Sequence, residues 1–168
     1  MKRPLLLSII LFQLISFTIS AQEVNIDDRL KPSLDDFFKI CKSYNIKYQT
    51  KLSSLKNIAI VDTLETTSKA TTLGMLERDK AKDVENIVIN WIAMLDPNIL
   101  KVVAFHEFGH YFLEYDTHVC NDCGTIMSVV NSSYFDIAND WENQIKILFE
   151  ESPAYRRNQS LIAATQAQ

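Results

Sequence analysis

The spacing of hydrophobic residues divides the first half of the chain into one helix and three strands. Ser33 is a favoured helix N-cap, and apolar positions follow it along one helical face: Leu34, Phe37, Phe38, Cys41 and Tyr44. Short apolar runs over 57–62, 71–76 and 86–92 predict three strands. The charged segment 77–83 is expected to be a solvated loop.

Two further helices are predicted in the second half of the chain. Asp96 and Pro97 suit the N-cap and the first position of a helix, because proline lacks an N–H that would have no partner there. After a turn-rich stretch over 116–133, another helix is expected over 137–150, and the tail beyond Pro153 is expected to fray. This order predicts one α+β domain, with a small mixed sheet, the helix that begins at Asp96 and Pro97 as its active-site helix, and a C-terminal helix.

The first 21 residues have the features of a secretory signal peptide. Lys2 and Arg3 precede an apolar run, and Ala21 offers a small residue for cleavage. The run is shorter than the ~20 apolar residues that span a bilayer, although a retained N-terminal anchor is the alternative. We therefore expect a mature domain over 22–168 that is secreted or periplasmic and has no stable membrane insertion.

The charge of the chain argues against nucleic acid as a partner. There are 17 Lys and Arg against 21 Asp and Glu, a net charge of −4, and loss of Lys2 and Arg3 leaves 15 against 21, or −6. The sequence has no basic cluster. Export permits disulfides, and the three cysteines, Cys41, Cys120 and Cys123, allow at most one bridge within the chain.

The three histidines of the chain lie within thirteen residues, at His106, His110 and His118. His106 and His110 are four apart, so on a helix both imidazoles leave the same face and suit one zinc ion. Glu107 is placed to exchange a proton with water at that metal. A catalytic zinc needs a third protein ligand, for which Asp116 and His118 are the nearest donors and Glu142 is a more distant alternative that lacks a supporting motif.

The segment from His106 to Ser128 resembles the metzincin clan of zinc peptidases. That clan has the pattern HExxHxxGxxH, followed by a methionine-containing turn beneath the metal. His106, Glu107 and His110 match the pattern, and 126–128 (Ile-Met-Ser) is similar to the Met-turn. The resemblance covers roughly 86–149 and implies a metzincin-like fold.

Two positions depart from the clan's pattern. Leu113 stands where the clan has a glycine that ends the helix, and Asp116 stands where its third histidine is expected. One subgroup of the clan uses Asp as that ligand. Bacterial proteins similar to this chain often have Leu at the glycine position and a slightly later histidine, so we favour His118 over Asp116.

Two features near the histidines point to a tightly held loop. Gly109 has no Cβ and therefore allows another segment to approach the helix closely near the metal. Cys120 and Cys123 border the Met-turn, so a bridge between them, or from one of them to Cys41, would tether that loop.

The resemblance implies a secreted zinc endopeptidase that acts on a peptide or protein substrate. One catalytic Zn²⁺ would be held by His106, His110 and His118, with Glu107 as general base and acid. The strand over 71–76 is a candidate sheet edge for an extended substrate. The alternatives are a weak or inactive zinc-binding protein that serves as a binding module, and a helical interaction module without metal.

Overall fold

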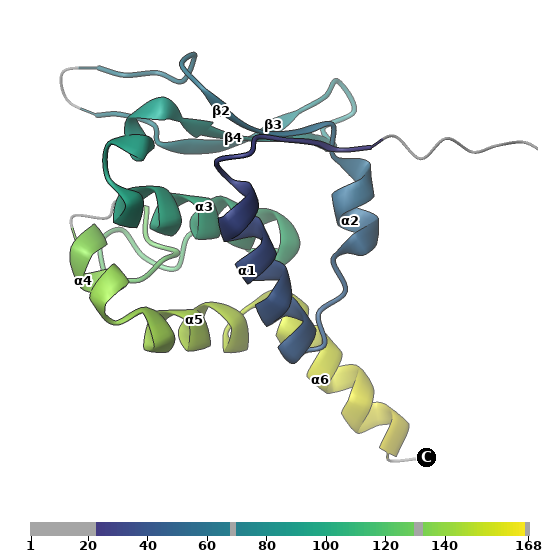
Figure 1. Ribbon diagram of the computed structural model, residues 1–168. Coiled ribbons are helices and arrows are strands. Elements are labelled where there is room, and N and C mark those ends of the chain that lie inside the picture. The colour runs from purple at the N-terminus through teal and green to yellow at the C-terminus, as the bar shows by residue number, and fades with distance from the viewer. Residues whose placement is uncertain (1–22, 68–69, 130–132, 167–168) are drawn as a thin grey trace, which may run out of the picture.

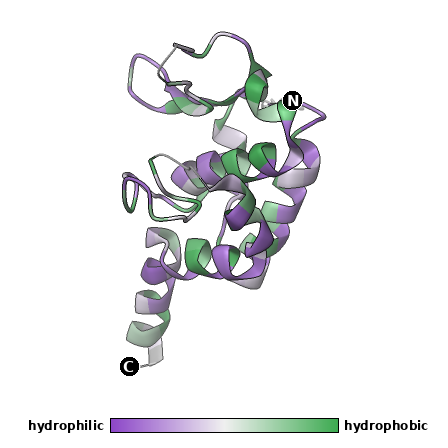
Figure 2. Cartoon of the chain, turned by 90° about the vertical axis from the view of Figure 1, so that its left-hand side faces the viewer, coloured by the Kyte–Doolittle hydropathy of each residue, from purple (hydrophilic) through white to green (hydrophobic). Residues whose placement is uncertain are grey.

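Figure 1 shows the computed structural model of the chain, which describes residues 23–67, 70–129 and 133–166. The predicted signal peptide over 1–21 lies outside these residues. A four-stranded sheet forms one layer, and the helices lie on one side of it (Figures 1 and 2). The predicted α+β class is therefore confirmed. Among the described helices, none combines the length and the apolar character needed to cross a membrane.

The sheet is mixed and has the strand order β1-β2-β4-β3. β1, β2 and β4 run parallel to one another, and β3 pairs with β4 in the antiparallel direction. β3 is therefore an edge strand, beside the most deeply buried strand of the sheet. The bounds are β1 Asn25–Ile26, β2 Asn57–Val61, β3 Gly74–Arg78 and β4 Val84–Asn90.

The edge strand β3 lies further along the chain than the predicted strand over 71–76. Glu77 and Arg78 belong to the strand and not to the predicted loop, which shortens to a turn over 79–83. An edge strand tolerates charged residues because one side of it faces solvent. Asn86 of β4 also supports the extension, since its Nδ2 donates to Glu77 Oε2 at 2.9 Å.

β4 begins and ends two residues earlier than the predicted strand over 86–92. Trp91 and Ile92 instead start a 3₁₀ helix, η1 (Trp91–Leu95). The reason is a local cap, because Asn90 Oδ1 accepts the backbone N–H of Ile92 at 3.1 Å. Such a side-chain cap competes with strand hydrogen bonds.

The first helix, α1 (Lys31–Ser43), starts two residues before the predicted cap. Leu30 is the N-cap residue and Pro32 lies in the first turn, so Ser33 is inside the helix and caps nothing. Proline is well tolerated there because its nitrogen needs no partner. Four side chains of the predicted inner face are buried: Leu34, Phe37, Phe38 and Cys41. The fifth, Tyr44, follows the last residue of the helix and is partly buried against the core.

Helix α3 (Pro97–Phe112) is the centre of the fold. It begins as predicted, with Asp96 Oδ1 accepting the N–H of Asn98 at 2.7 Å. It packs between the sheet and the other helices, in contact with β3, β4 and α1. Its aromatic side chains surround Phe37 of α1 at ring-centroid distances of 5.3–5.9 Å, together with Phe149: Phe105, Phe108 and Phe112. This core fixes the helix that bears two of the histidines.

The predicted helix over 137–150 is two helices, α4 (Tyr134–Asn139) and α5 (Trp141–Glu150), which meet at Asp140. Another short helix, α2 (Gln49–Ser54), was not predicted. None of its residues is buried. A helix without a buried face does not need the apolar periodicity by which helices are predicted from sequence.

The prediction of a frayed tail is wrong. Residues Pro153–Gln166 form α6, which runs away from the rest of the fold in Figure 1. Ser152 Oγ accepts the N–H of Tyr155 at 3.2 Å and so caps the helix start. Arg157 forms an ion pair with Glu114, just after α3. The ion pair joins residues distant in sequence, and the cap involves a single side chain. Neither contributes to the hydrophobic periodicity from which helices were predicted.

Candidate metal centre

The three histidines converge on one point. Nε2 of His106 lies 3.1 Å from Nε2 of His110 and 3.1 Å from Nε2 of His118, and the remaining pair is 3.3 Å apart. Three imidazole nitrogens at these distances are close enough to bind one metal ion together.

Backbone carbonyls orient two of the three rings. His106 Nδ1 donates to Ile126 O at 2.6 Å, and His110 Nδ1 donates to Tyr115 O at 2.6 Å. A carbonyl only accepts, so Nδ1 carries the proton in each neutral ring and Nε2 presents its lone pair to the shared point. This outer hydrogen bond is typical of metal-ligating histidine.

Burial favours the neutral form of these rings. Desolvation lowers the pKa of His106 to about 4, even though its hydrogen bond to Ile126 acts in the opposite direction. Desolvation also lowers the pKa of His110 and of His118. Since neutral imidazole is the form that binds a metal ion, the three rings are ready to do so at neutral pH.

The turn after α3 explains why His118 joins this group. Leu113 keeps a helical conformation, and the left-handed residue is Glu114, with φ of 66°. Glycine is usual at such a position. Here the Glu114 side chain is held by Lys51 at 3.1 Å and by Arg157. The chain therefore reverses without a glycine at 113 and leaves Asp116 exposed, outside the group of convergent donors.

The close approach predicted at Gly109 is confirmed, and the approaching residue is Met127. A Cβ at Gly109 would lie 2.8 Å from Met127 Sδ and 3.3 Å from Leu148 Cδ1. Met127 is itself buried. The loop after His118 thus packs directly against α3 between its two histidines.

Glu107 lines the same cleft as the histidines. This cleft has a volume of about 520 Å³ and is bounded by α3 and by residues 70–76, which include the start of β3. Only 6% of Glu107 is exposed, and burial raises its pKa to about 8. Its side chain lies against the backbone of Gly74, where an added Cβ would be 2.3 Å from Oε1.

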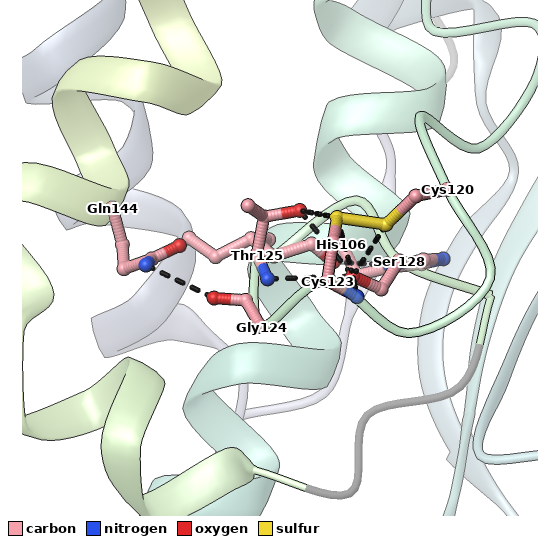
Figure 3. The surroundings of a disulfide bond; sticks show 8 residues. His106, Cys120, Cys123, Gly124, Thr125, Ser128 and Gln144 are labelled. Atoms are coloured by element: carbon pink, nitrogen blue, oxygen red, sulfur yellow. Dashed lines mark hydrogen bonds between the residues drawn. A yellow bond between two sulfur atoms is a disulfide. The ribbon is translucent and has the colours of Figure 1, made fainter.

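A disulfide closes the loop beyond His118. Cys120 is bonded to Cys123, which decides the pairing that the sequence left open (Figure 3). Cys41 is a free, buried thiol, and burial raises its pKa to about 12.

Comparison with protein-family models, with curated proteins and with solved structures finds no match for this chain. Its functional interpretation therefore depends on the site itself. Sequence reasoning identified the three histidines and Glu107, but it missed Gly74 and the carbonyls of Tyr115 and Ile126. The two carbonyls act through backbone atoms, which have no side-chain signature. The only indication in the sequence for Gly74 was that a glycine stands within a predicted apolar strand, where a side chain would be usual.

Proposed function

We propose that this protein is a zinc-dependent endopeptidase of metzincin type that acts outside the cytoplasm. The observation that supports it best is the position of Glu107 in the same cleft as three convergent imidazole nitrogens. A buried carboxylate is costly to keep charged. A site that only holds metal has no need of a buried carboxylate beside the ion, whereas a hydrolase uses such a carboxylate as general base and acid.

The donor set and its spacing favour zinc. Tetrahedral coordination with Zn–N bonds of about 2.0–2.1 Å places two ligand nitrogens ~3.3 Å apart. The separations among the three Nε2 atoms are 3.1–3.3 Å. Three neutral imidazoles suit zinc, and they leave one coordination position for water, as catalytic zinc sites do.

The chain's own residues would divide the work of peptide hydrolysis. A zinc ion bound here would act as a Lewis acid and make water nucleophilic near neutral pH. The positive charge of the bound ion would counter the burial that raises the pKa of Glu107, so that its carboxylate could accept the proton of the attacking water and deliver it to the leaving amine. His106 and His110, oriented by their carbonyl partners, would hold the geometry constant during turnover.

The edge strand β3 would bind the substrate. Among the described residues no strand pairs with its outer side, so the backbone N–H and C=O groups there can bind an extended peptide. The cleft runs along its first residues, from Gly74 to Leu76, and reaches the histidines. A peptide paired with β3 would therefore pass in front of Glu107.

The direct test is metal content and cleavage of an unstructured protein such as casein. The purified protein should bind about one zinc ion per chain, a chelator should abolish cleavage, and added zinc should restore it. His110→Ala should lose tight zinc binding, because only one ligand remains on the helix. Folded protein that takes up no zinc contradicts the metal assignment. Protein that binds zinc and cleaves nothing would favour the binding-module alternative.

Replacing Gly74 with Ala should lower turnover at least ~10-fold at unchanged zinc affinity. The new Cβ would lie 2.3 Å from Glu107 Oε1 and 2.5 Å from its Cγ, so the carboxylate must move. A displacement of ~1 Å in a reacting group costs up to ~10² in rate. Combining Gly74→Ala with Glu107→Gln is the control, since the glycine change should then have no further effect. Wild-type turnover in Gly74→Ala would show that this contact does not position Glu107.

A further inference from the structure

His118 is the ligand with the least support from the rest of the fold. It lies in the loop between α3 and α4, whose described residues form neither helix nor strand. Its ring is exposed, and within the described part of the chain its Nδ1 has no hydrogen-bond partner. His106 and His110 each have a carbonyl partner at that atom. The position of His118 therefore depends on the path of the loop backbone.

The disulfide begins two residues after His118, where the loop backbone is hydrogen-bonded to the segment around Met127. Val119 N donates to Met127 O at 3.0 Å, on one side of Cys120. Ser128 Oγ lies 3.3 Å from Cys120 Sγ and accepts the N–H of Cys123 at 3.4 Å (Figure 3). The bridge thus keeps both of its cysteines around the Ser128 hydroxyl.

The segment around Met127 is in turn held to the helices. Ile126 O accepts from His106 Nδ1 at 2.6 Å, and Met127 packs against Gly109. Gln144 of α5 donates through Nε2 to Gly124 O at 3.1 Å (Figure 3). The loop that carries His118 and the bridge is therefore attached to a segment whose place relative to the two helix ligands is already determined.

The bridge is accessible to reductants, whereas the remaining cysteine is not. Cys123 is exposed and Cys120 is partly exposed. Cys41 is completely buried in the core. Exposed disulfides are more readily reduced than buried structural ones, so a reductant would act on the bridge beside the metal ligands.

We propose that the Cys120–Cys123 disulfide positions His118, so that the protein holds its metal tightly only in the oxidised state. The inference rests on the proposed function for the identity of the metal, zinc. A dithiol would supply two electrons and two protons, which convert the bridge into two thiols while the dithiol becomes a disulfide. The site would then retain the two helix ligands and lose a preorganised third one.

The test is the zinc affinity of the full chain, measured by competition with a chromophoric chelator. Cys120→Ser/Cys123→Ser removes the bridge without leaving thiols that bind zinc themselves. We expect it to bind zinc ~10–100-fold more weakly than the oxidised wild type, the range for loss of an outer-shell contact. Cys41→Ala is the matched control and should bind zinc as the wild type does. Circular dichroism reports folding, and Cys120→Ala/Cys123→Ala replaces the serine pair if that pair does not fold.

His118→Ala separates positioning of the ligand from general support of the loop. In that background the bridge has no ligand to position, so its removal should not weaken zinc binding further. If the two losses add instead, the bridge acts independently of His118 and the inference is overturned.

The outcomes also separate this inference from the peptidase proposal. Equal zinc affinity with and without the bridge would overturn the inference and leave the peptidase proposal intact. Bridge-dependent zinc binding without peptide cleavage would support the inference and overturn the peptidase proposal. Oxidised wild type that binds no zinc would overturn both.

Discussion

Replacing Glu107 with Gln should leave zinc bound but reduce turnover at least ~10²-fold. Glu107 is not one of the convergent donors, so the metal keeps its three ligands. Glutamine has the same shape, so the contact with the backbone of Gly74 can persist. What it lacks is the ability to accept a proton and return it to the leaving amine. Zinc content and kcat on a fluorogenic peptide, measured on the same sample, test this expectation.

Glu142→Gln is the matched control for this change. Glu142 is exposed in the first turn of α5 and does not line the cleft. The same loss of one carboxylate there should leave both zinc content and kcat at the wild-type level. If Glu107→Gln loses zinc in proportion to activity, Glu107 contributes to metal binding and its assignment as proton carrier is wrong.

His118→Ala should weaken zinc binding by more than the ~10–100-fold that an outer-shell substitution costs, because it removes one of three protein ligands. Its Nε2 lies 3.1 Å from that of His106 and 3.3 Å from that of His110. With two ligands left on one helix, the ion would be shared mainly with solvent. Isothermal titration with zinc, on protein first stripped of metal, measures the loss.

Asp116→Ala is the comparison that decides between the two ligands considered from the sequence. Asp116 is exposed, and its carboxylate influences His110 through charge alone. An exposed charge interaction of this kind contributes at most about 1 kcal/mol. Asp116→Ala should therefore change the zinc affinity by no more than ~5-fold. Loss of zinc in Asp116→Ala together with its retention in His118→Ala would reverse the assignment and make the carboxylate the third ligand.

The parts of the site that lie on one helix were predictable from the sequence. Asp96 and Pro97 determine where α3 begins, and the helical repeat then places His106 and His110 on the same face. Glu107 follows from its position next to His106. These relations depend on local backbone geometry, which is the same in every α-helix.

Spacing along the sequence left Asp116 and His118 as the nearest candidates for the third ligand, with Glu142 as a more distant one, and did not choose among them. The choice depends on Glu114, which adopts the left-handed conformation that glycine usually supplies. Contacts with Lys51 and Arg157 hold its side chain, and these partners come from distant parts of the chain. The clan's pattern requires glycine at position 113, so it does not predict a turn whose left-handed residue is Glu114.

The tertiary structure also decided the boundaries and contacts that depend on neighbours distant in sequence. The edge strand begins at Gly74 and ends at Arg78 because it pairs with β4, and that pairing brings Gly74 against Glu107. The bridge between Cys120 and Cys123 was one of several permitted pairings until the loop path was known. Hydrophobic periodicity determines which face of an element is buried. The separation of residues in different elements is set by packing and loop conformation, which involve the whole chain.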